Sequence, residues 1–488
     1  MSPEEYNIGV LTDGDIGTNL TYRLASSGYT PTIFNTNIIN MERSRGQRYV
    51  SELERMGIDT CLDYDSFFLS LKENRVIFII SNNQLFSKEI LKEIDKHLDS
   101  TDIIIDMCDC NYDVATKRCD AYKSRGVSYM ATGFSGGEYA ALHGASLMPG
   151  GSLETYNNIR PLFEALSAKY GTTPCCDYIG PDGSGMYVKM IHNGIEYVMM
   201  QVICEVIGAL KKLLGYGQED ICDILREWET GDTDSYLIDL SRYIYSKIDA
   251  HTNKPIVDIT SDKVEYSQSV KWLCASALDL SVPVPTIHAS IEQRFFSGMK
   301  NERIGASNLF KTPIIPVREV ERDSFIEMAR AAYCVTGLCA YMEGFALLSR
   351  ANEVYMWKMN LNSIAQMLEG SSFIKSRLLR HVIDAYGKSE KGSSNLLKKS
   401  GYGATVNRYL PHARIFANIC IESGIAMPAL LSALTYIDTY RLSPMPSGLI
   451  SLIRDHIENT GYVRNDEMLG VYTADWENPD DIIKSFKK

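Results

Sequence analysis

The stretch at residues 183–205 constrains the fold of this chain more than any other. Most of its positions are apolar, which is the pattern of a helix buried inside a large domain. Burying polar or charged groups without partners is costly, so any polar face of this helix needs water, a partner network or a ligand. Five polar side chains recur at spacings of three and four and therefore share one helical face: Lys189, His192, Asn193, Glu196 and Tyr197.

Two ionisable residues of this face are the candidate catalytic groups. Lys189 and Glu196 are two helical turns apart, so both could reach one small molecule from the same side. A partly desolvated lysine can act as a base near neutral pH, and a glutamate in such a site can act as an acid. The pair suits an oxidation followed by protonation of a carbanion-like centre. A buried ladder of ion pairs is the structural alternative.

Length and composition exclude several classes of protein. A chain of 488 residues that is 45% hydrophobic should form two or three domains. Its net charge of -12 argues against a nucleic-acid partner. We expect no membrane span, because no run of about 18 uncharged apolar residues occurs, and we find no signal-peptide pattern. The twelve cysteines include no C-x-x-C pair, which favours a reduced, cytoplasmic compartment and no metal site.

The first 182 residues alternate between short β-branched runs and helical segments. This alternation predicts an α/β, doubly wound, Rossmann-type domain with a parallel sheet. The expected strands cover 7–11, 28–34, 75–80, 101–106 and 126–132, and the expected helices between them cover 18–27, 41–56, 87–98 and 111–125. Ligands of such sheets lie beyond the carboxyl ends of the strands. Candidate cofactor contacts there are Asn35, Thr36, Asn82 and Asp109, and plain polar loop residues are the alternative.

The turn after the first strand reads TDGDIG at residues 12–17. Gly14 and Gly17 match the second and third glycines of a dinucleotide-binding G-x-G-x-x-G turn, whereas Thr12 replaces the first. Backbone N–H groups at the start of the following helix would hold a pyrophosphate. The candidate contacts are Gly14, Ile16 and Gly17. An ordinary strand–helix turn, with Asp13 and Asp15 adding negative charge, is the alternative.

Two glycine-rich segments follow. The SGGE segment at 135–138 places three amides and a hydroxyl in one tight turn, which suits an anion or a carboxylate. The LMPGG segment at 147–151 predicts a turn that leads into a further apolar stretch. Either segment can also be read as a turn without a binding role.

Long helical runs dominate after residue 182. We expect helices at 186–215, 218–229, 268–279, 284–300, 319–350, 360–385 and 414–440. The expected organisation is a dinucleotide-binding domain at 1–182, an all-helical domain at 183–440 and a C-terminal tail at 441–488. The first helix of the second domain would lie against the mouth of the sheet, with its polar face near a nicotinamide.

Several motifs carry a family resemblance over essentially the whole chain. They are VKMIHNGIEY at 188–197, SGGE at 135–138, SLMPGG at 146–151, KNERIGAS at 300–307, and RLSP with LIRD between 441 and 455. The chain resembles the 6-phosphogluconate dehydrogenase family, whose members belong to the pentose phosphate pathway. The resemblance implies a homodimer, formed through the helical domain, whose C-terminal tail threads into the partner subunit. It also implies oxidative decarboxylation of 6-phosphogluconate to ribulose 5-phosphate with reduction of NADP, with NAD as the alternative cofactor.

The resemblance assigns roles to individual residues. Lys189 would be the general base on the 3-hydroxyl, and Glu196 would protonate the enediol carbon. Arg294, and Arg454 from the other subunit's tail, would grip the substrate phosphate, which suits the forked arginine side chain. The remaining substrate-holding positions are Ser135, Gly136, Gly137, His192, Asn193 and Tyr197.

The chain departs from the family pattern mainly on the cofactor side and in part of the phosphate clamp. The departing positions are Thr12 for a glycine, Thr36 for the arginine that pairs with the 2′-phosphate of NADP, Ser81 and Ser267 for lysines, Asp109 for an asparagine and Thr460 for a histidine. Lys271 or Lys263 could compensate for Ser267. Three hypotheses follow: a working enzyme with altered cofactor use, a non-catalytic paralogue that keeps fold and dimer for binding or regulation, and a hydroxyacid dehydrogenase for another substrate.

Overall fold

The computed structural model describes residues 6–83, 85–310, 321–387, 395–466 and 470–476. The chain divides into two compact units, 1–434 and 435–488, which are described separately.

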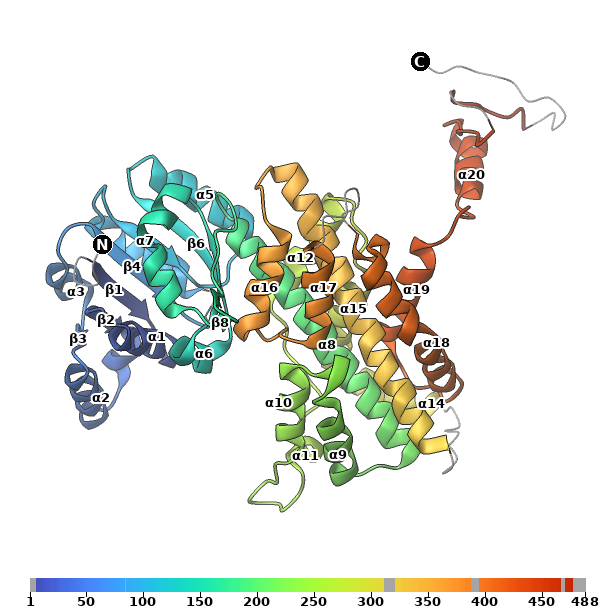
Figure 1. Cartoon of the computed structure of the whole chain (residues 1–488), viewed down its shortest axis with the longest axis horizontal. Coiled ribbons are helices and arrows are strands. Elements are labelled where there is room, and N and C mark those ends of the chain that lie inside the picture. The colour runs from blue at the N-terminus through green and yellow to red at the C-terminus, as the bar shows by residue number, and fades with distance from the viewer. Residues whose placement is uncertain (1–5, 84, 311–320, 388–394, 467–469, 477–488) are drawn as a thin grey trace. The chain divides into compact units, whose positions relative to one another are not determined.

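The first unit begins with a seven-stranded sheet in the order β3-β2-β1-β4-β5-β6-β7 (Figure 1). The strands are β1 Asn7–Thr12, β2 Pro31–Asn35, β3 Asp59–Thr60, β4 Arg75–Ile80, β5 Ile103–Asp106, β6 Ser128–Ser135 and β7 Ser146–Gly150. Neighbouring strands are parallel except for β6 and β7, which are antiparallel. The central strand β4 is buried along its whole length, as expected for a sheet covered on both faces. The Rossmann-type fold is thereby confirmed, with an antiparallel edge added.

Helices cover both faces of this sheet (Figure 1). They are α1 Asp15–Ser26, α2 Arg43–Arg55, α3 Tyr64–Ser70, α4 Phe86–Ile94, α5 Tyr112–Lys123, α6 Gly137–His143 and α7 Leu153–Leu166. Apolar side chains of the strands pack against α1 and α7 in one buried cluster that includes Val10, Leu20 and Leu162. This packing fixes where each strand ends and therefore where the loops beyond the sheet begin.

The prediction of a turn at 147–151 was wrong, because most of this segment forms β7. The composition, with Pro149 followed by two glycines, is typical of a turn. Proline is nevertheless tolerated in an edge strand, where its missing N–H breaks no ladder. All five residues of β7 are buried, and Leu147 and Pro149 are hydrogen-bonded to the chain at 175–179.

The rest of the first unit is helical. Its helices are α8 Ser184–Leu214, α9 Gln218–Trp228, α10 Tyr236–Tyr245, α11 Ile256–Ile259, α12 Gln268–Asp279, α13 Pro285–Gly298, α14 Lys300–Leu309, α15 Arg322–Tyr355, α16 Leu361–Ser371, α17 Arg377–Gly387, α18 Ser400–Glu422 and α19 Pro428–Tyr440, whose end passes into the second unit. The central pair is α8 and α15, which pack along each other, while α8 also contacts β6 and β7. Among the described helices α15 has the length and apolar composition of a membrane span, but it is a buried core helix.

Two helix predictions need correction. The segment 360–385 forms two helices, α16 and α17, and 414–440 comprises the end of α18 and all of α19. The first break is not visible in the apolar pattern, because Ile374 continues it as a buried residue. The buried carboxylate of Glu369 instead accepts a hydrogen bond from the N–H of Ser376 and stabilises the break. The second break contains Gly424, whose φ of 62° is left-handed. Helices α10, α11 and α14 were not predicted.

The second unit contains α20 Gly448–Glu458 and a short segment that folds back onto it. The buried carboxylate of Asp455 accepts hydrogen bonds from the N–H groups of Gly461 and Ala474 and from the indole of Trp476. Four apolar residues of α20 are exposed within this unit: Leu449, Ile450, Ile453 and Ile457.

Candidate active site

A cavity of about 270 Å³ lies at the carboxyl edge of the sheet. Residues that follow β1, β4, β5 and β6 line it, and α8 contributes Lys189. The lining residues are Ile16, Ile80, Ser81, Asn82, Met107, Asp109, Phe134, Ser135, Gly136, Gly137, Lys189, Ser267 and Phe373. The structure therefore brings the candidate base into the same cavity as the expected cofactor loops.

Glycines let α8 approach the sheet closely enough to place Lys189 in this cavity. A Cβ atom on Gly133 of β6 would lie 2.7 Å from the Cβ of Lys189, and one on Gly185 of α8 would lie 2.1 Å from the carbonyl oxygen of Met148. Neither approach is possible with a larger residue unless the backbone moves. The position of the lysine is thus set by backbone packing between α8 and β6.

The Ser135-Gly136-Gly137 turn closes one side of the cavity. Gly136 has a φ of 122°, which non-glycine residues rarely adopt. A Cβ on Gly136 would lie 2.7 Å from the carbonyl oxygen of Ser371, so the turn packs directly against the end of α16. Phe373, just beyond that end, consequently reaches the cavity.

His192 connects this turn to the polar face of α8. Its Nε2 lies 2.9 Å from the Ser135 hydroxyl, and its Nδ1 lies 3.0 Å from the side-chain oxygen of Asn193. Complete burial, together with the charge of Lys189, holds the pKa of His192 well below its usual range, so the ring is neutral.

The hydrogen bonds of Asn193 determine which nitrogen of that ring carries the proton. The amide nitrogen of Asn193 donates to Asp109 at 3.2 Å and to the Ser269 hydroxyl at 2.9 Å, which leaves its oxygen as an acceptor. The Nδ1 of His192 therefore donates to Asn193, and Nε2 accepts from Ser135. The network joins α8, α12 and the loops after β5 and β6.

Glu196 lies next to this network, with an Oε2 atom 3.8 Å from the Nδ1 of His192 and 19% of its side chain exposed. Burial raises the pKa of Glu196, and the negative charge of Asp109 raises it further. Lys189 and Arg294 act in the opposite direction without reversing the shift. The carboxyl group thus takes up a proton more readily than an ordinary glutamate, which suits a general acid.

Tyr197 and Arg294 extend the polar face beyond Glu196. The Tyr197 hydroxyl accepts a hydrogen bond of 2.6 Å from the N–H of Ser267, and the Arg294 guanidinium lies over the Tyr197 ring at 4.4 Å. Arg294 is carried by α13, whose first N–H groups, those of Thr286 and Ile287, donate to the carboxylate of Glu343. Burial raises the pKa of Glu343 to about 7. A buried carboxylate of α15 thereby fixes the start of the helix that carries the arginine.

One departure in the substrate region, Ser267, has neither of the two candidate lysines beside it in the cavity. Ser267 lines the cavity, and its hydroxyl lies 2.8 Å from that of Ser269. The ammonium group of Lys271 instead lies over the ring of Tyr266, 4.4 Å from its centroid. Neither Lys271 nor Lys263 is among the described residues that line the cavity.

Arg454 and Thr460 belong to the second unit and are both exposed there. Arg454 lies on α20, where its guanidinium pairs with Glu458 at 3.2 Å. Of the two arginines expected at the phosphate, the first unit contains Arg294 and the second contains Arg454.

The glycine-rich turn presents the start of α1 to the cofactor edge. No side chain caps this helix, so its first N–H groups can serve a diphosphate. However, the hydroxyl of Thr12 accepts a hydrogen bond of 3.3 Å from the N–H of Gly14. A Cβ on Gly17 would lie 2.3 Å from the Thr12 side chain, so Thr12 fills the space that this glycine leaves open. The turn fits a diphosphate, with one donor already occupied by the protein itself.

Some of the side chains expected to contact the adenosine half of the cofactor form hydrogen bonds within the fold instead. Asn35 is buried, and its oxygen accepts a hydrogen bond from the N–H of Asn37. The Thr36 hydroxyl donates to the carbonyl oxygen of Thr12 at 3.4 Å, whereas Asn82 is exposed. Asn35 thus shapes the loop, while Asn82 is open to a ligand.

Sequence reasoning missed Phe373, Phe134, Met107 and Ser269 at this site. Phe373 lies between α16 and α17, in the break that the apolar pattern concealed. The other three are ordinary apolar or hydroxyl side chains in a strand, a loop and a helix, and no spacing signal distinguishes them.

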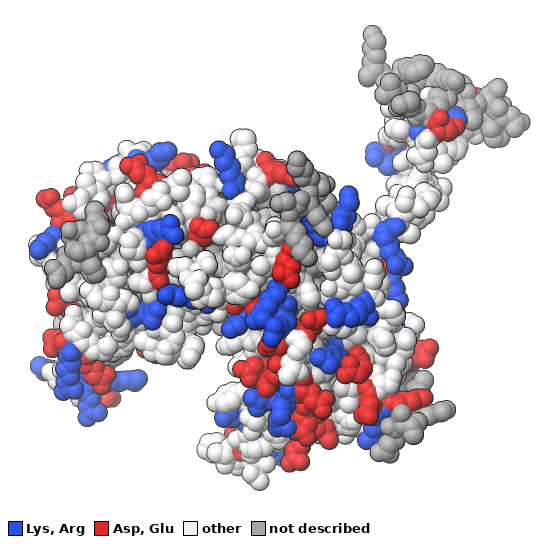
Figure 2. All heavy atoms as spheres, viewed as in Figure 1, with Lys and Arg blue, Asp and Glu red and all other residues white. Residues whose placement is uncertain are grey.

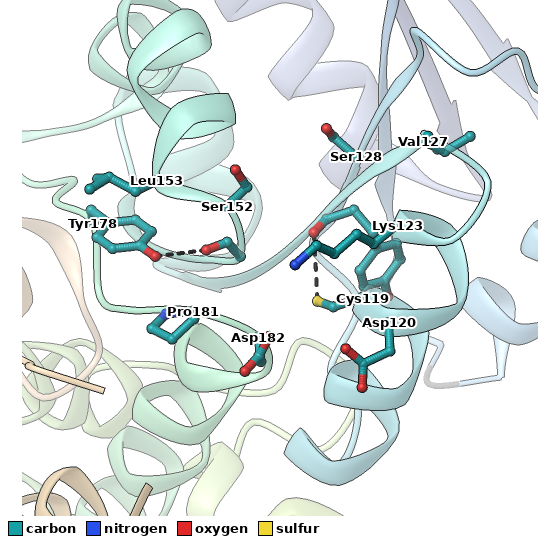
Figure 3. A pocket seen from close by; sticks show the side chains of 13 residues that line it. Cys119, Asp120, Lys123, Val127, Ser128, Ser152, Leu153, Tyr178, Pro181 and Asp182 are labelled. Carbon is teal, nitrogen blue, oxygen red and sulfur yellow. Dashed lines mark hydrogen bonds between the residues drawn. The ribbon is translucent and has the colours of Figure 1, made fainter. Parts of the chain in front are cut away.

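A larger hollow of about 420 Å³ lies at the opposite edge of the sheet (Figure 3). It is lined by the start of β6 and by Asp120, Lys123 and Asp182. Since Ser135 ends β6 and Ser128 begins it, the two cavities are separated by roughly 20 Å of strand. Two carboxylates beside one lysine do not suit an anionic substrate, so the smaller cavity is the better candidate.

A dinucleotide-type sheet whose carboxyl edge shares a cavity with a lysine- and glutamate-bearing helix defines an NAD(P)-dependent oxidoreductase. Comparison with known proteins agrees: the NAD binding domain of 6-phosphogluconate dehydrogenase matches residues 7–180, and the C-terminal domain of 6-phosphogluconate dehydrogenase matches residues 185–476. This chain belongs to the 6-phosphogluconate dehydrogenase family.

Similar proteins with different cofactors are found at comparable identity. The NADP(+)-dependent decarboxylating 6-phosphogluconate dehydrogenase of Bacillus subtilis is 35% identical over 96% of this chain and 98% of its own length. The NAD(+)-dependent enzyme of the same organism is 31% identical over 96% and 99%. The structure of Plasmodium falciparum 6-phosphogluconate dehydrogenase, studied with NADP+ and with 6-phosphogluconate, matches with a TM-score of 0.88 and 29% identity, covering 96% of this chain and 100% of that one. The family binds a nicotinamide cofactor, and its members differ in which one.

Proposed function

We propose that this chain catalyses the oxidative decarboxylation of 6-phosphogluconate to ribulose 5-phosphate with reduction of NADP. The observation that carries the proposal is the polar face of α8, which places Lys189 in the cavity and Glu196, with its raised pKa, beside His192. The Plasmodium falciparum relative, whose fold this chain shares, forms a complex with the same sugar acid. The proposal includes a cytoplasmic location and no nucleic-acid partner.

The chemistry divides between the two ionisable groups. Lys189 removes the proton of the 3-hydroxyl, and the nicotinamide, when bound, accepts the hydride from the same carbon. The bond to the carboxylate then breaks, CO₂ leaves and the electron pair passes to the 3-keto oxygen, which takes its proton back from Lys189. Glu196 then protonates the enediol carbon while Lys189 takes back the proton of the enol oxygen, which gives the ketone, and the raised pKa of Glu196 supports its role as the acid.

The neutral residues of the site hold the substrate. Neutral His192 and Ser135 form a fixed hydrogen-bonded pair at the glycine-rich turn. Because the ring is neutral, it does not form an ion pair with the substrate carboxylate. Arg294, whose guanidinium lies over the ring of Tyr197, would bind the substrate phosphate.

A direct assay tests the proposal. Purified protein is given 6-phosphogluconate with NADP or NAD, and formation of reduced nicotinamide is followed by absorbance. Activity that disappears in Lys189→Met supports the proposal. A folded wild-type protein that forms no reduced nicotinamide with either cofactor contradicts it.

We also propose a homodimer, formed through the helical domain at 183–440, in which the tail at 441–488 completes the partner's site. The exposed apolar side chains of α20 supply the surface that such docking would bury. Mixing Lys189→Met with Arg454→Ala tests this, because a hybrid dimer with exchanged tails contains one site with both residues intact. Recovered activity in the mixture supports exchange, and no recovery after subunit exchange contradicts it.

A non-catalytic paralogue is the second candidate, favoured by the occupied N–H of Gly14 and by the serine at position 267. Calorimetric titration discriminates the two, since micromolar affinity for a dinucleotide argues against a purely structural role. A hydroxyacid dehydrogenase for another substrate is the third, and it would not require Arg294 and Arg454 to bind one phosphate.

A further inference from the structure

Helix α2 carries an unpaired cluster of arginines at its start. Arg43, Arg45 and Arg48 are exposed, and none of them forms an ion pair with a residue that the structure describes. The first turn of α2 contains no acidic residue. Figure 2 shows the resulting concentration of positive charge over α2, in a chain whose net charge is -12. Such a cluster on an acidic protein is a candidate site for an anion.

Tyr49 fixes α2 beside the end of the second strand. Its hydroxyl lies 2.5 Å from the Thr18 hydroxyl, in the first turns of α1, and accepts a hydrogen bond of 3.1 Å from the amide of Asn35, the last residue of β2. The hydroxyl is therefore in contact with two elements that border the cofactor edge. The start of α2 cannot move away from that edge without breaking these bonds.

Helical geometry relates the arginines to this contact. Arg45 precedes Tyr49 by four residues, so both lie on the same face, with Arg45 one turn closer to the start of α2. Arg48 follows Arg45 by three residues and is its neighbour on the helix surface. The face that Tyr49 turns towards β2 thus includes Arg45, with Arg48 beside it.

The carboxyl end of β2 is where dinucleotide-binding domains distinguish their two cofactors. An acidic residue there binds the 2′-hydroxyl of NAD, whereas an arginine nearby accommodates the 2′-phosphate of NADP. The loop Asn35-Thr36-Asn37 contains neither charge. A phosphate monoester is best held by forked guanidinium groups, and α2, which Tyr49 joins to the last residue of β2, carries three exposed ones near its start.

We propose that Arg45 and Arg48 of α2 bind the 2′-phosphate and give this chain its preference for NADP over NAD. The cationic function has moved from the loop after β2 to the helix that follows it. Arg43 adds charge next to the same site. This inference rests on the proposed use of a nicotinamide cofactor, and it specifies which cofactor and which residues select it.

The test measures binding, using adenosine 2′,5′-bisphosphate and 5′-AMP as probes of the full-length protein by calorimetry. We expect wild type to bind the bisphosphate at least tenfold more tightly than 5′-AMP. Arg45→Ala and Arg48→Ala should each weaken bisphosphate binding by about tenfold, and the double variant by about a hundredfold, with 5′-AMP unaffected. Arg55→Ala, in the last turn of the same helix, is the matched control and should change neither.

Other results overturn the inference. Equal affinity of wild type for the two probes would do so, as would a double variant that binds the bisphosphate normally or loses 5′-AMP to the same extent. Failure of the proposed reaction is a separate outcome. A protein that selects the bisphosphate through α2 but does not oxidise 6-phosphogluconate refutes only the reaction, whereas an active enzyme whose KM for NADP is unchanged in the double variant refutes only the role of α2.

Discussion

The polar face of α8 and the loops after the strands form two halves of one cavity, yet they are built differently. On α8, His192 and Asn193 are buried and bound to side chains of other elements. On the cofactor side, Asn82 lines the cavity and is exposed, and the exposed arginines of α2, which do not line it, form no ion pair with a described residue. A change in the first half disrupts a hydrogen-bonded network and costs stability. A change at Asn82 or at these arginines acts mainly on a ligand, whereas Thr12 and Thr36 of the same half are also hydrogen-bonded within the fold.

The largest expected effect is at Lys189, and it tests whether the α8 half of the site is catalytic. Lys189→Met should lower kcat by about 10³- to 10⁴-fold, because the 3-hydroxyl loses its base. Steady-state kinetics measure this, and calorimetric affinity for 6-phosphogluconate should change far less than kcat. A variant that retains more than a tenth of wild-type kcat would assign the proton transfer to another group.

The second-largest effect is expected at Glu196, and it should change how kcat depends on pH. Its raised pKa favours the protonated form, and the amount of that form falls as pH rises through the pKa. The wild-type kcat should therefore decline on the alkaline side, and Glu196→Gln should lower kcat by about 10²- to 10³-fold and lack that decline. The profile of kcat against pH checks this, and an unchanged alkaline decline in the variant would exclude Glu196 as its source.

Substitution of Thr36 tests whether the cofactor side of the site can be changed without disturbing the α8 side. Thr36→Arg should tighten NADP by about tenfold by adding one charged contact to the phosphate, and it should leave NAD unchanged. Calorimetry with both dinucleotides supplies the measurement. Thr36→Gln, similar in length but uncharged, is the control, and equal tightening by the two variants would show that charge is not the cause.

The smallest expected effect is at Thr12. Thr12→Gly frees the N–H of Gly14 for a diphosphate and should tighten NADP and NAD alike by a few-fold. Loss of the side chain that packs on Gly17, together with the added backbone freedom, should also lower the free energy of unfolding by about 1 kcal/mol. Titration and urea unfolding separate the two effects, and tightening of only one dinucleotide would contradict this explanation.

The periodic parts of the molecule were predictable from the sequence, and the irregular parts were not. The alternation of apolar runs is sufficient for the Rossmann-type sheet, and the spacing of polar residues places the α8 face correctly as one stripe. The break that carries Phe373 depends on a carboxylate from another turn, Glu369, which no local pattern reveals. The catalytic and binding roles of the stripe stay predictions until the variants are measured.

Interactions between distant segments explain the remaining differences. The compensation expected from Lys271 fails because Tyr266 offers its ammonium group an aromatic face nearby. The arginines of α2 become candidates for cofactor binding because Tyr49 contacts Thr18 and Asn35. Neither contact follows from spacing along the chain, since each depends on how a loop or helix packs.

A Cβ atom on Gly17 would lie 2.3 Å from the side chain of Thr12, so these two positions are interdependent. While threonine stands at 12, even one methyl group at 17 would overlap its side chain. Any substitution of Gly17 therefore requires that position 12 change first or at the same time. The order in which these two positions of the turn can change is constrained accordingly.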